Sequence, residues 1–285
     1  MMIKRSRGFT LVEMIMVIVI TGIIGGMVAI FIRAPVQGYV DSARRADMTD
    51  IADSALRRIA RDLRMALPNS VRITTVGSNT FLEFIPTIGG GRYRDSTDSL
   101  GAGNILNFSA ADTSFDVLGA MPPVATGDQI VIYNLGIPGA DAYAGNTAAT
   151  HNRRAVSGVA GNVISITSGN ALPFDSCVYE GGFVVGGCRF QVVQTPVTYV
   201  CIPAAGGVGG TLTRWQGYVI QSSQPATLPG AGTSSVMANN VSACTFAYDA
   251  SVVAQRSGLV TMHLTITEQG ESVSLYGATH VSNMP

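Results

Sequence analysis

Charged residues are scarce in this chain, and their two signs cancel. The 285 residues include 18 Lys and Arg against 18 Asp and Glu, and charged residues make up 13% of the composition. A general nucleic-acid-binding protein carries a basic excess, so this class is excluded. Apolar residues make up 47% of the chain, which also excludes a disordered chain.

Motifs that carry catalysis or metal binding are missing. His151, His263 and His280 are scattered, and none belongs to an H-E-x-x-H motif. There is no G-x-S-x-G nucleophile turn and no C-x-x-C pair of the kind that binds zinc. Asp95 and Asp98 in "RDSTDS" are candidates for calcium, but a solvated acidic loop is the stronger interpretation. We therefore expect no enzyme activity, no cofactor and no metal site.

The main feature present is a long apolar run near the N-terminus. From Phe9 to Ile32 the sequence contains one charge, Glu13. A helix of this length, at about 1.5 Å per residue, crosses a hydrocarbon core of roughly 30 Å. Basic residues before the run keep the first residues in the cytoplasm and send the remainder outward. No small-x-small site for a conventional signal peptidase follows the run. The basic residues are Lys4, Arg5 and Arg7.

The stretch "RGFTLVEMIMVIVITG" resembles the N-terminus of type IV pilins and type II secretion pseudopilins. The resemblance implies that a prepilin peptidase removes residues 1–8 by cutting after Gly8 on the cytoplasmic side, and methylates the new terminus at Phe9. It also implies that Glu13 pairs with the terminal amine of a neighbouring subunit. A carboxylate near the centre of a membrane helix costs about 2.5–3.5 kcal/mol, so it is usually retained for a function and given a partner.

After the apolar run, the pattern predicts a continued helix and then a β-rich head. The helix is expected over residues 9–67, with 9–32 in the membrane and 33–67 as a stalk that packs on the head; proline ends it in "ALPNSV". Residues 68–285 are expected to form one globular head. The prediction is an α+β protein with the type IV pilin fold, in which the helix packs on an antiparallel sheet with long loops.

Short alternating segments separated by turn residues indicate the strands of the head. Val260 to Thr267 alternates strictly, and "EQGE" then turns the chain into "SVSLYG" as a hairpin. Two segments, "GGGRYRDSTDSLGAG" and "PGADAYAGNTAATHN", are interpreted as surface loops. The other expected strands are "VRITTV", "TFLEFI", "DQIVIYN", "NVISIT", "RFQVVQ", "VTYVCI" and "ACTFAYD".

Four cysteines, all in the second half, indicate two disulfides in an oxidising compartment, although four buried thiols are an alternative. Four cysteines allow three connectivities. Because "VYEGGFVVGG" is glycine-rich and can turn back on itself, we favour Cys177 with Cys188. Cys201 then pairs with Cys244 and ties two expected strands together.

Segments of the head, including "RRIARDLRMALPNSVRI" and "NNVSACTFAYD", resemble minor pilins of the mannose-sensitive haemagglutinin (MSHA) pilus. This resemblance implies a minor pilin with a single-pass inner-membrane helix and a periplasmic head, which then enters a fibre or its tip. The implied partners are the prepilin peptidase, major and minor pilins, the inner-membrane assembly platform and the membrane, without nucleic acid.

Three alternatives remain open. One is a minor pseudopilin of type II secretion, which shares the same N-terminal motif and apolar helix. Another is a carbohydrate-binding tip adhesin in which Trp215, Tyr218 or Tyr143 stacks on a sugar, although packing is the stronger interpretation of these rings. The third is a membrane-anchored enzyme, for which no catalytic constellation is found.

Overall fold

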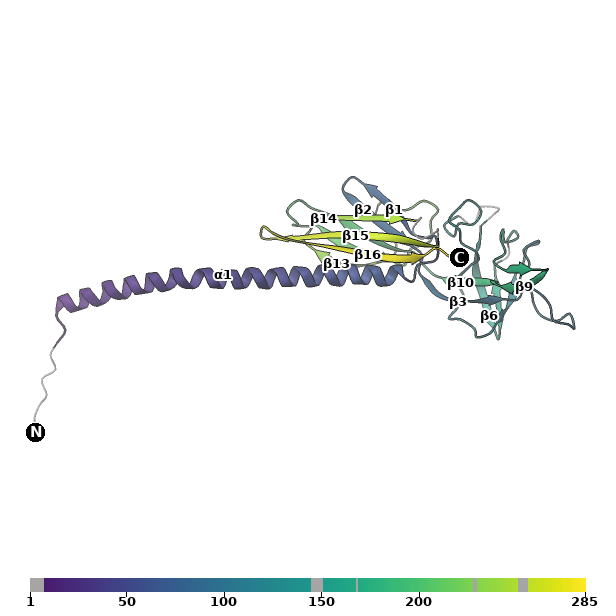
Figure 1. Ribbon diagram of the computed structural model, residues 1–285, viewed down its shortest axis with the longest axis horizontal. Helices are drawn as coiled ribbons and strands as arrows, with labels where there is room; N and C mark the ends of the chain where they lie inside the picture. Colours follow the sequence, from purple (N-terminus) through teal and green to yellow (C-terminus); the bar gives the residue numbers. More distant parts are fainter. Residues whose placement is uncertain (1–7, 145–150, 168, 228–229, 251–255) are drawn as a thin grey trace, which may run out of the picture. The chain divides into compact units, whose positions relative to one another are not determined.

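The computed structural model describes residues 8–144, 151–167, 169–227, 230–250 and 256–285. The chain divides into two compact units, Met1–Met48 and Thr49–Pro285. The first unit contains the N-terminal part of one long helix, α1 (Leu11–Leu63), and the second contains the end of that helix and the strands of the described residues (Figure 1). An α+β chain with one long N-terminal helix and a β-rich head is therefore confirmed.

The helix α1 continues through Pro35, although proline has no N–H to give to the carbonyl one turn earlier. It ends at Leu63, four residues before the predicted end at residue 67. The next turn is tighter than an α-helical turn, because the N–H of Met65 bonds to the carbonyl three residues earlier, that of Asp62, at 3.0 Å. The N–H of Leu67 then bonds to the carbonyl of Ile85 at 2.7 Å, so pairing with another segment ends the helix before the proline does.

The second unit contains two sheets that are linked by a disulfide. A five-stranded antiparallel sheet has the order β1-β2-β11-β12-β13, and a three-stranded one has the order β14-β15-β16. Their bounds are β1 Arg72–Val76, β2 Asn79–Phe84, β11 Val197–Ile202, β12 Thr211–Gln216, β13 Thr233–Asn239, β14 Val241–Asp249, β15 Ser257–Glu268 and β16 Glu271–Ser282. The predicted hairpin is β15 and β16, with Glu268 opposite Glu271 at its turn.

A closed barrel with the order β10-β3-β4-β7-β6-β5 is inserted between β2 and β11 in the sequence. Its core is dominated by aromatic and branched side chains, with Phe115 and Phe190 meeting edge to face at 5.4 Å between centroids. A separate hairpin, β8-β9, precedes β10. The bounds are β3 Thr87–Tyr93, β4 Ser114–Leu118, β5 Gln129–Val131, β6 Arg153–Ala160, β7 Val163–Ile166, β8 Val178–Glu180, β9 Phe183–Gly186 and β10 Arg189–Val193.

The end of α1, from Thr49 onward, packs on the three-stranded sheet of the head. Ala52, Leu56 and Ile59 are buried there. Gly277 on β16 faces this part of the helix, and a Cβ built on it would lie 3.7 Å from the Cβ of Leu56, an ordinary contact distance. The carboxylate of Asp62 accepts hydrogen bonds from the Tyr199 hydroxyl at 2.8 Å and from Arg214 Nε at 2.7 Å. These bonds also fix the helix end to β11 and β12.

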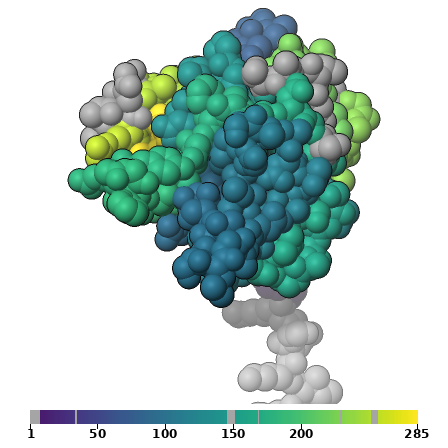
Figure 2. All heavy atoms as spheres, turned by 90° about the vertical axis from the view of Figure 1, so that its right-hand side faces the viewer, coloured from purple at the N-terminus to yellow at the C-terminus, as the bar shows by residue number. Residues whose placement is uncertain are grey.

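The predicted loop over residues 89–103 is wrong in its first part, since residues 89–93 belong to β3. The glycine run forms a strand by pairing with β10, which lies so close that larger side chains would not fit without a shift. A Cβ on Gly91 would lie 2.8 Å from the ring of Phe190. The remainder, from Arg94, lies outside the strands, and the blue segment between β3 and β4 covers much of the face in Figure 2. Residues 145–150 of the second predicted loop lie outside the described residues.

Candidate functional site: the processing and assembly segment

The predicted cleavage site lies in an irregular stretch directly ahead of the helix. Residues 8–10 have no regular structure, and α1 begins at Leu11. Gly8 is exposed, and the side chain of Phe9 is 83% exposed. The peptide bond between them is therefore open to an enzyme without any unwinding of α1. Residues 1–7 of the predicted leader lie outside the described part of the chain.

Thr10 and Glu13 form a capping box at the start of α1. Glu13 Oε2 accepts hydrogen bonds from the backbone N–H and the hydroxyl of Thr10, both at 3.0 Å. In return, the N–H of Glu13 donates to Thr10 Oγ1 at 3.3 Å. Such an exchange satisfies donors that the first turn of a helix cannot pair internally. The T-x-x-E spacing carried this signal in the sequence, and our sequence analysis missed the role of Thr10.

The capping box also determines what remains available on Glu13 for another subunit. Oε2 already accepts two hydrogen bonds, whereas Oε1 accepts none from the described residues. Phe9, whose nitrogen becomes the terminal amine after the predicted cleavage, is the direct neighbour of Thr10. An ammonium group near this carboxylate would form a charge-assisted hydrogen bond in surroundings of low dielectric constant. The pairing itself stays a prediction.

One helix of the described residues, α1, is long and apolar enough to cross a membrane by length and composition, and its most apolar stretch is not buried. Thr21 is a polar residue within this stretch. Its hydroxyl donates to the carbonyl of Val17 at 2.6 Å, so its hydrogen bond is satisfied within the same helix. Glu13 is therefore distinguished from Thr21 by a carboxylate oxygen that still lacks a donor.

The four cysteines form the two disulfides that the sequence favoured, Cys177–Cys188 and Cys201–Cys244. The second joins β11 to β14 and therefore connects the two sheets. The first closes the base of the β8-β9 hairpin.

Asp175 also fixes the β8-β9 hairpin, through hydrogen bonds. It accepts a hydrogen bond from the N–H of Cys177 at 2.8 Å and another from the hydroxyl of Tyr93. It also accepts one from Tyr179 at 2.5 Å. This last bond, followed by burial, raises the pKa of Tyr179 to about 12.

The acidic and imidazole residues considered in the sequence do not converge on one site. Asp95 lies near Cys177 and Cys188, whose sulfurs are already joined to each other and are therefore not thiolate ligands. Asp98 instead orders its own loop by accepting from the N–H groups of Leu100 and Ala102. His263 and His280 lie on β15 and β16 but are not opposite each other in the register, and His151 precedes β6.

Two of the three aromatic residues considered for sugar stacking are buried. The Tyr143 hydroxyl donates to the carbonyl of Ser70 at 2.9 Å, and Arg72 lies 3.5 Å over its ring. The Tyr218 hydroxyl donates to Glu83 Oε1 at 2.9 Å. Both rings are therefore packed inside the head and are not available to stack on a sugar. Trp215 lies partly buried on β12.

Comparison with known proteins gives a match in the N-terminal segment alone. The prokaryotic N-terminal methylation motif matches residues 3–29. Neither the curated proteins nor the solved structures contain a match to the chain. The matched residues include Gly8, Phe9 and Glu13. This motif, together with one apolar N-terminal helix, supports a type IV pilin- or pseudopilin-like protein that is anchored in a membrane by a single span.

Proposed function

We propose that this protein is a minor pilin of an MSHA-like type IV pilus, of the kind called MshO. It is inserted in the inner membrane with its head in the periplasm, and the prepilin peptidase cuts between Gly8 and Phe9 and methylates Phe9. It then acts with major and minor pilins, on the inner-membrane assembly platform, in the initiation of assembly or at the fibre tip. The observation that carries the proposal is the match of residues 3–29 to the methylation motif, with Gly8 and Phe9 exposed directly before the apolar helix α1.

The head supports a role in subunit contact. It contains an inserted six-stranded barrel and a hairpin fixed by a disulfide, which together enlarge the surface that it offers to a partner. Apolar side chains on the β8-β9 hairpin are exposed: Val178, Tyr179, Phe183 and Val185. Within the fibre, the first half of α1 would become a packing surface, and Glu13 would set the register against a neighbour.

The test compares Glu13→Gln with Thr21→Val, which removes another polar group from the same apolar stretch. Removal of one charge-assisted hydrogen bond costs about 1.5–3 kcal/mol, or roughly ten- to a hundredfold in an equilibrium. We expect E13Q to lower the amount of protein in sheared fibres by this order, while its amount in membranes is unchanged. T21V should leave both amounts unchanged, because Thr21 bonds only within its own helix.

Two results would contradict the proposal. If E13Q enters fibres as well as the unaltered chain, Glu13 does not set the register. If the unaltered chain is processed but never leaves the membrane while fibres form, it is not a fibre subunit, and a priming factor or a pseudopilin of type II secretion becomes the better account. Quantification of a head peptide in the fibre and membrane fractions measures both outcomes.

A further inference from the structure

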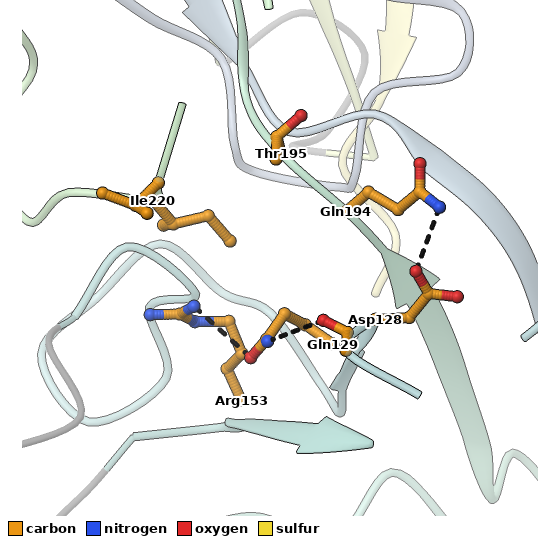
Figure 3. A pocket seen from close by; sticks show the side chains of 8 residues that line it. Asp128, Gln129, Arg153, Gln194, Thr195 and Ile220 are labelled. Carbon is orange, nitrogen blue, oxygen red and sulfur yellow. Dashed lines mark hydrogen bonds between the residues drawn. The ribbon is translucent and has the colours of Figure 1, made fainter. Parts of the chain in front are cut away.

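A polar cavity of about 530 Å³ lies in the head, beside the barrel strands β5, β6 and β10 and the segment that follows β12 (Figure 3). This volume is within the usual range of small-molecule sites, roughly 300–1,000 Å³. Its lining combines a cation, a carboxylate, two amides, a hydroxyl and two aliphatic side chains. The side chains that supply these groups are Arg153, Asp128, Gln129, Gln194, Thr195, Val219 and Ile220.

Arg153 is the unusual member of this lining. It is 7% exposed, and no carboxylate of the described residues lies within 4.0 Å of its guanidinium. Nη1 lies 3.5 Å from Gln129 Oε1, and Nη2 lies 3.4 Å from the carbonyl of Ala144. These contacts are longer than the usual 2.9–3.0 Å or so. Nε has no hydrogen-bond partner among the residues that the structure describes. The charge of Asp141 acts on Arg153, but this carboxylate lies beyond 4.0 Å and forms no ion pair with it. A buried cation with long hydrogen bonds and no ion pair is costly unless an anion joins it.

Other buried or half-buried arginines of the head are satisfied by the protein itself. Arg72 and Arg214 each form an ion pair, with Glu83 at 2.8 Å and Asp62 at 2.7 Å. Arg154 is the neighbour of Arg153 on β6, and its side chain points to the opposite face of the strand. Its Nη1 donates to the carbonyl of His151 at 2.9 Å, which helps to satisfy it without a carboxylate. Arg153 therefore has hydrogen-bonding capacity that the described part of the head does not use.

The remaining polar groups of the cavity are suited to hydroxyl groups. Asp128 is held in place by Gln194 Nε2 at 3.0 Å and by the N–H of Ala125 at 2.8 Å, and each of its oxygens can accept a further hydrogen bond. Figure 3 shows Gln129 between Asp128 and Arg153, with Gln194 and Thr195 along one side and Ile220 on the other. One cation beside one carboxylate does not favour a multiply charged phosphate, which would be repelled by Asp128.

We propose that this cavity binds the uronic-acid unit of an acidic saccharide. Arg153 would receive the carboxylate of the sugar through a two-pronged hydrogen bond. Asp128, Gln129 and Gln194 would bind the ring hydroxyls, and Val219 and Ile220 would contact the apolar C–H groups of the ring. This inference does not depend on the assembly role, because it concerns the head of the processed or unprocessed chain alike.

The test uses the full chain in phospholipid nanodiscs and measures sugar binding by calorimetry. The probes are D-glucuronate and D-galacturonate, with D-glucose, D-galactose and inorganic phosphate as comparisons. We expect at least one uronate to bind ten times or more tightly than its uncharged parent sugar and than phosphate. Affinity should fall as salt is added, because the attraction between the charges is screened.

Two kinds of variant locate the site. Arg153→Gln should lower uronate affinity tenfold or more, but this residue is buried and its replacement can impair folding. Val219 is 74% exposed at the cavity, so Val219→Asp adds a repelling charge without disturbing a core, while Val219→Asn is its uncharged match. V219D should lose binding and V219N should keep it. Val208→Asp places the same charge at a residue that is 84% exposed and does not line the cavity, and it should bind normally.

The proposal is overturned if neither uronate binds the unaltered chain, or if phosphate or the uncharged sugars bind as tightly as the uronates. It is also overturned if V219D and V219N bind equally well, since the sugar carboxylate would then lie elsewhere. A normal uronate affinity together with a failure of fibre entry would leave this inference standing and contradict only the assembly role.

Discussion

The buried pair of Arg72 and Glu83 allows a prediction about which partner is more costly to remove. Glu83 on β2 is opposite Arg72 on β1, and Arg72 Nε donates to its Oε2 at 2.8 Å. Glu83 Oε1 accepts from the Tyr218 hydroxyl at 2.9 Å. Arg72 also donates to the carbonyls of Ser222 and Gln221, at 2.9 and 3.0 Å. The pair therefore fixes the segment after β12 to the five-stranded sheet.

The two side chains differ in their access to water, and this difference determines the prediction. The side chain of Arg72 is 20% exposed, whereas that of Glu83 is 0% exposed. Arg72→Met leaves a fully buried carboxylate without its cation, and removal of one partner of a buried pair costs about 3–5 kcal/mol. Glu83→Leu leaves an arginine that keeps two carbonyl partners and some water, so we expect about 1.5–3 kcal/mol, the usual range for a charged hydrogen bond.

Urea unfolding of the full chain in nanodiscs, followed by fluorescence of Trp215, the single tryptophan, measures these free energies. The double variant R72M/E83L should lose less stability than the sum of the two single variants, by about 1 kcal/mol or more, because neither charge is left alone. A larger loss for E83L than for R72M, or strictly additive losses, would refute the reasoning.

Two further predictions concern the disulfides and alkaline pH. Cys201–Cys244 has a sequence separation of 43 and Cys177–Cys188 one of 11, which give about 4 and about 3 kcal/mol of stabilisation in the chain-entropy model. C201A/C244A should therefore lower the urea midpoint more than C177A/C188A. Equal midpoints for the two double variants would contradict this ranking. Because the pKa of Tyr179 is raised to about 12, the folded chain keeps a proton that the unfolded chain loses near pH 10. Stability should therefore fall as the pH rises from about 10 to 12, and Y179F should reduce this slope; an unchanged slope in Y179F would count against the assignment.

The features of the N-terminal segment could be predicted from the sequence because their signals are local. An apolar run, one carboxylate and a preceding glycine lie within a few turns of each other, and each has a direct physical meaning. The hairpin of β15 and β16 was equally accessible, since Val260 to Thr267 alternates strictly between apolar and polar residues. Its register then follows from a turn of two residues between Glu268 and Glu271.

The closed barrel was not predicted, although three of its strands, β5, β7 and β10, lie in segments expected as strands. The closure depends on pairing between segments that are distant in the sequence. The glycine run of β3 has little strand propensity of its own and forms a strand by pairing with β10, where Phe190 is opposite Gly91 and leaves no room for a larger side chain. The strand β6 begins with two arginines, a pattern that indicates a surface. Among the described residues, Arg153 lacks a carboxylate within 4.0 Å and a partner for Nε because of what the fold places around it, so no local pattern reveals the cavity.

The central claim is that the chain is processed as a pilin at Gly8, and mass spectrometry of its N-terminal peptide tests it most directly. Sheared surface fibres and stripped membranes are digested, and the peptide that begins at Phe9 is quantified in each. The account predicts a methylated Phe9 peptide in the fibres, at a small fraction of the major subunit. A chain whose peptides still continue through Gly8 in both fractions would contradict it.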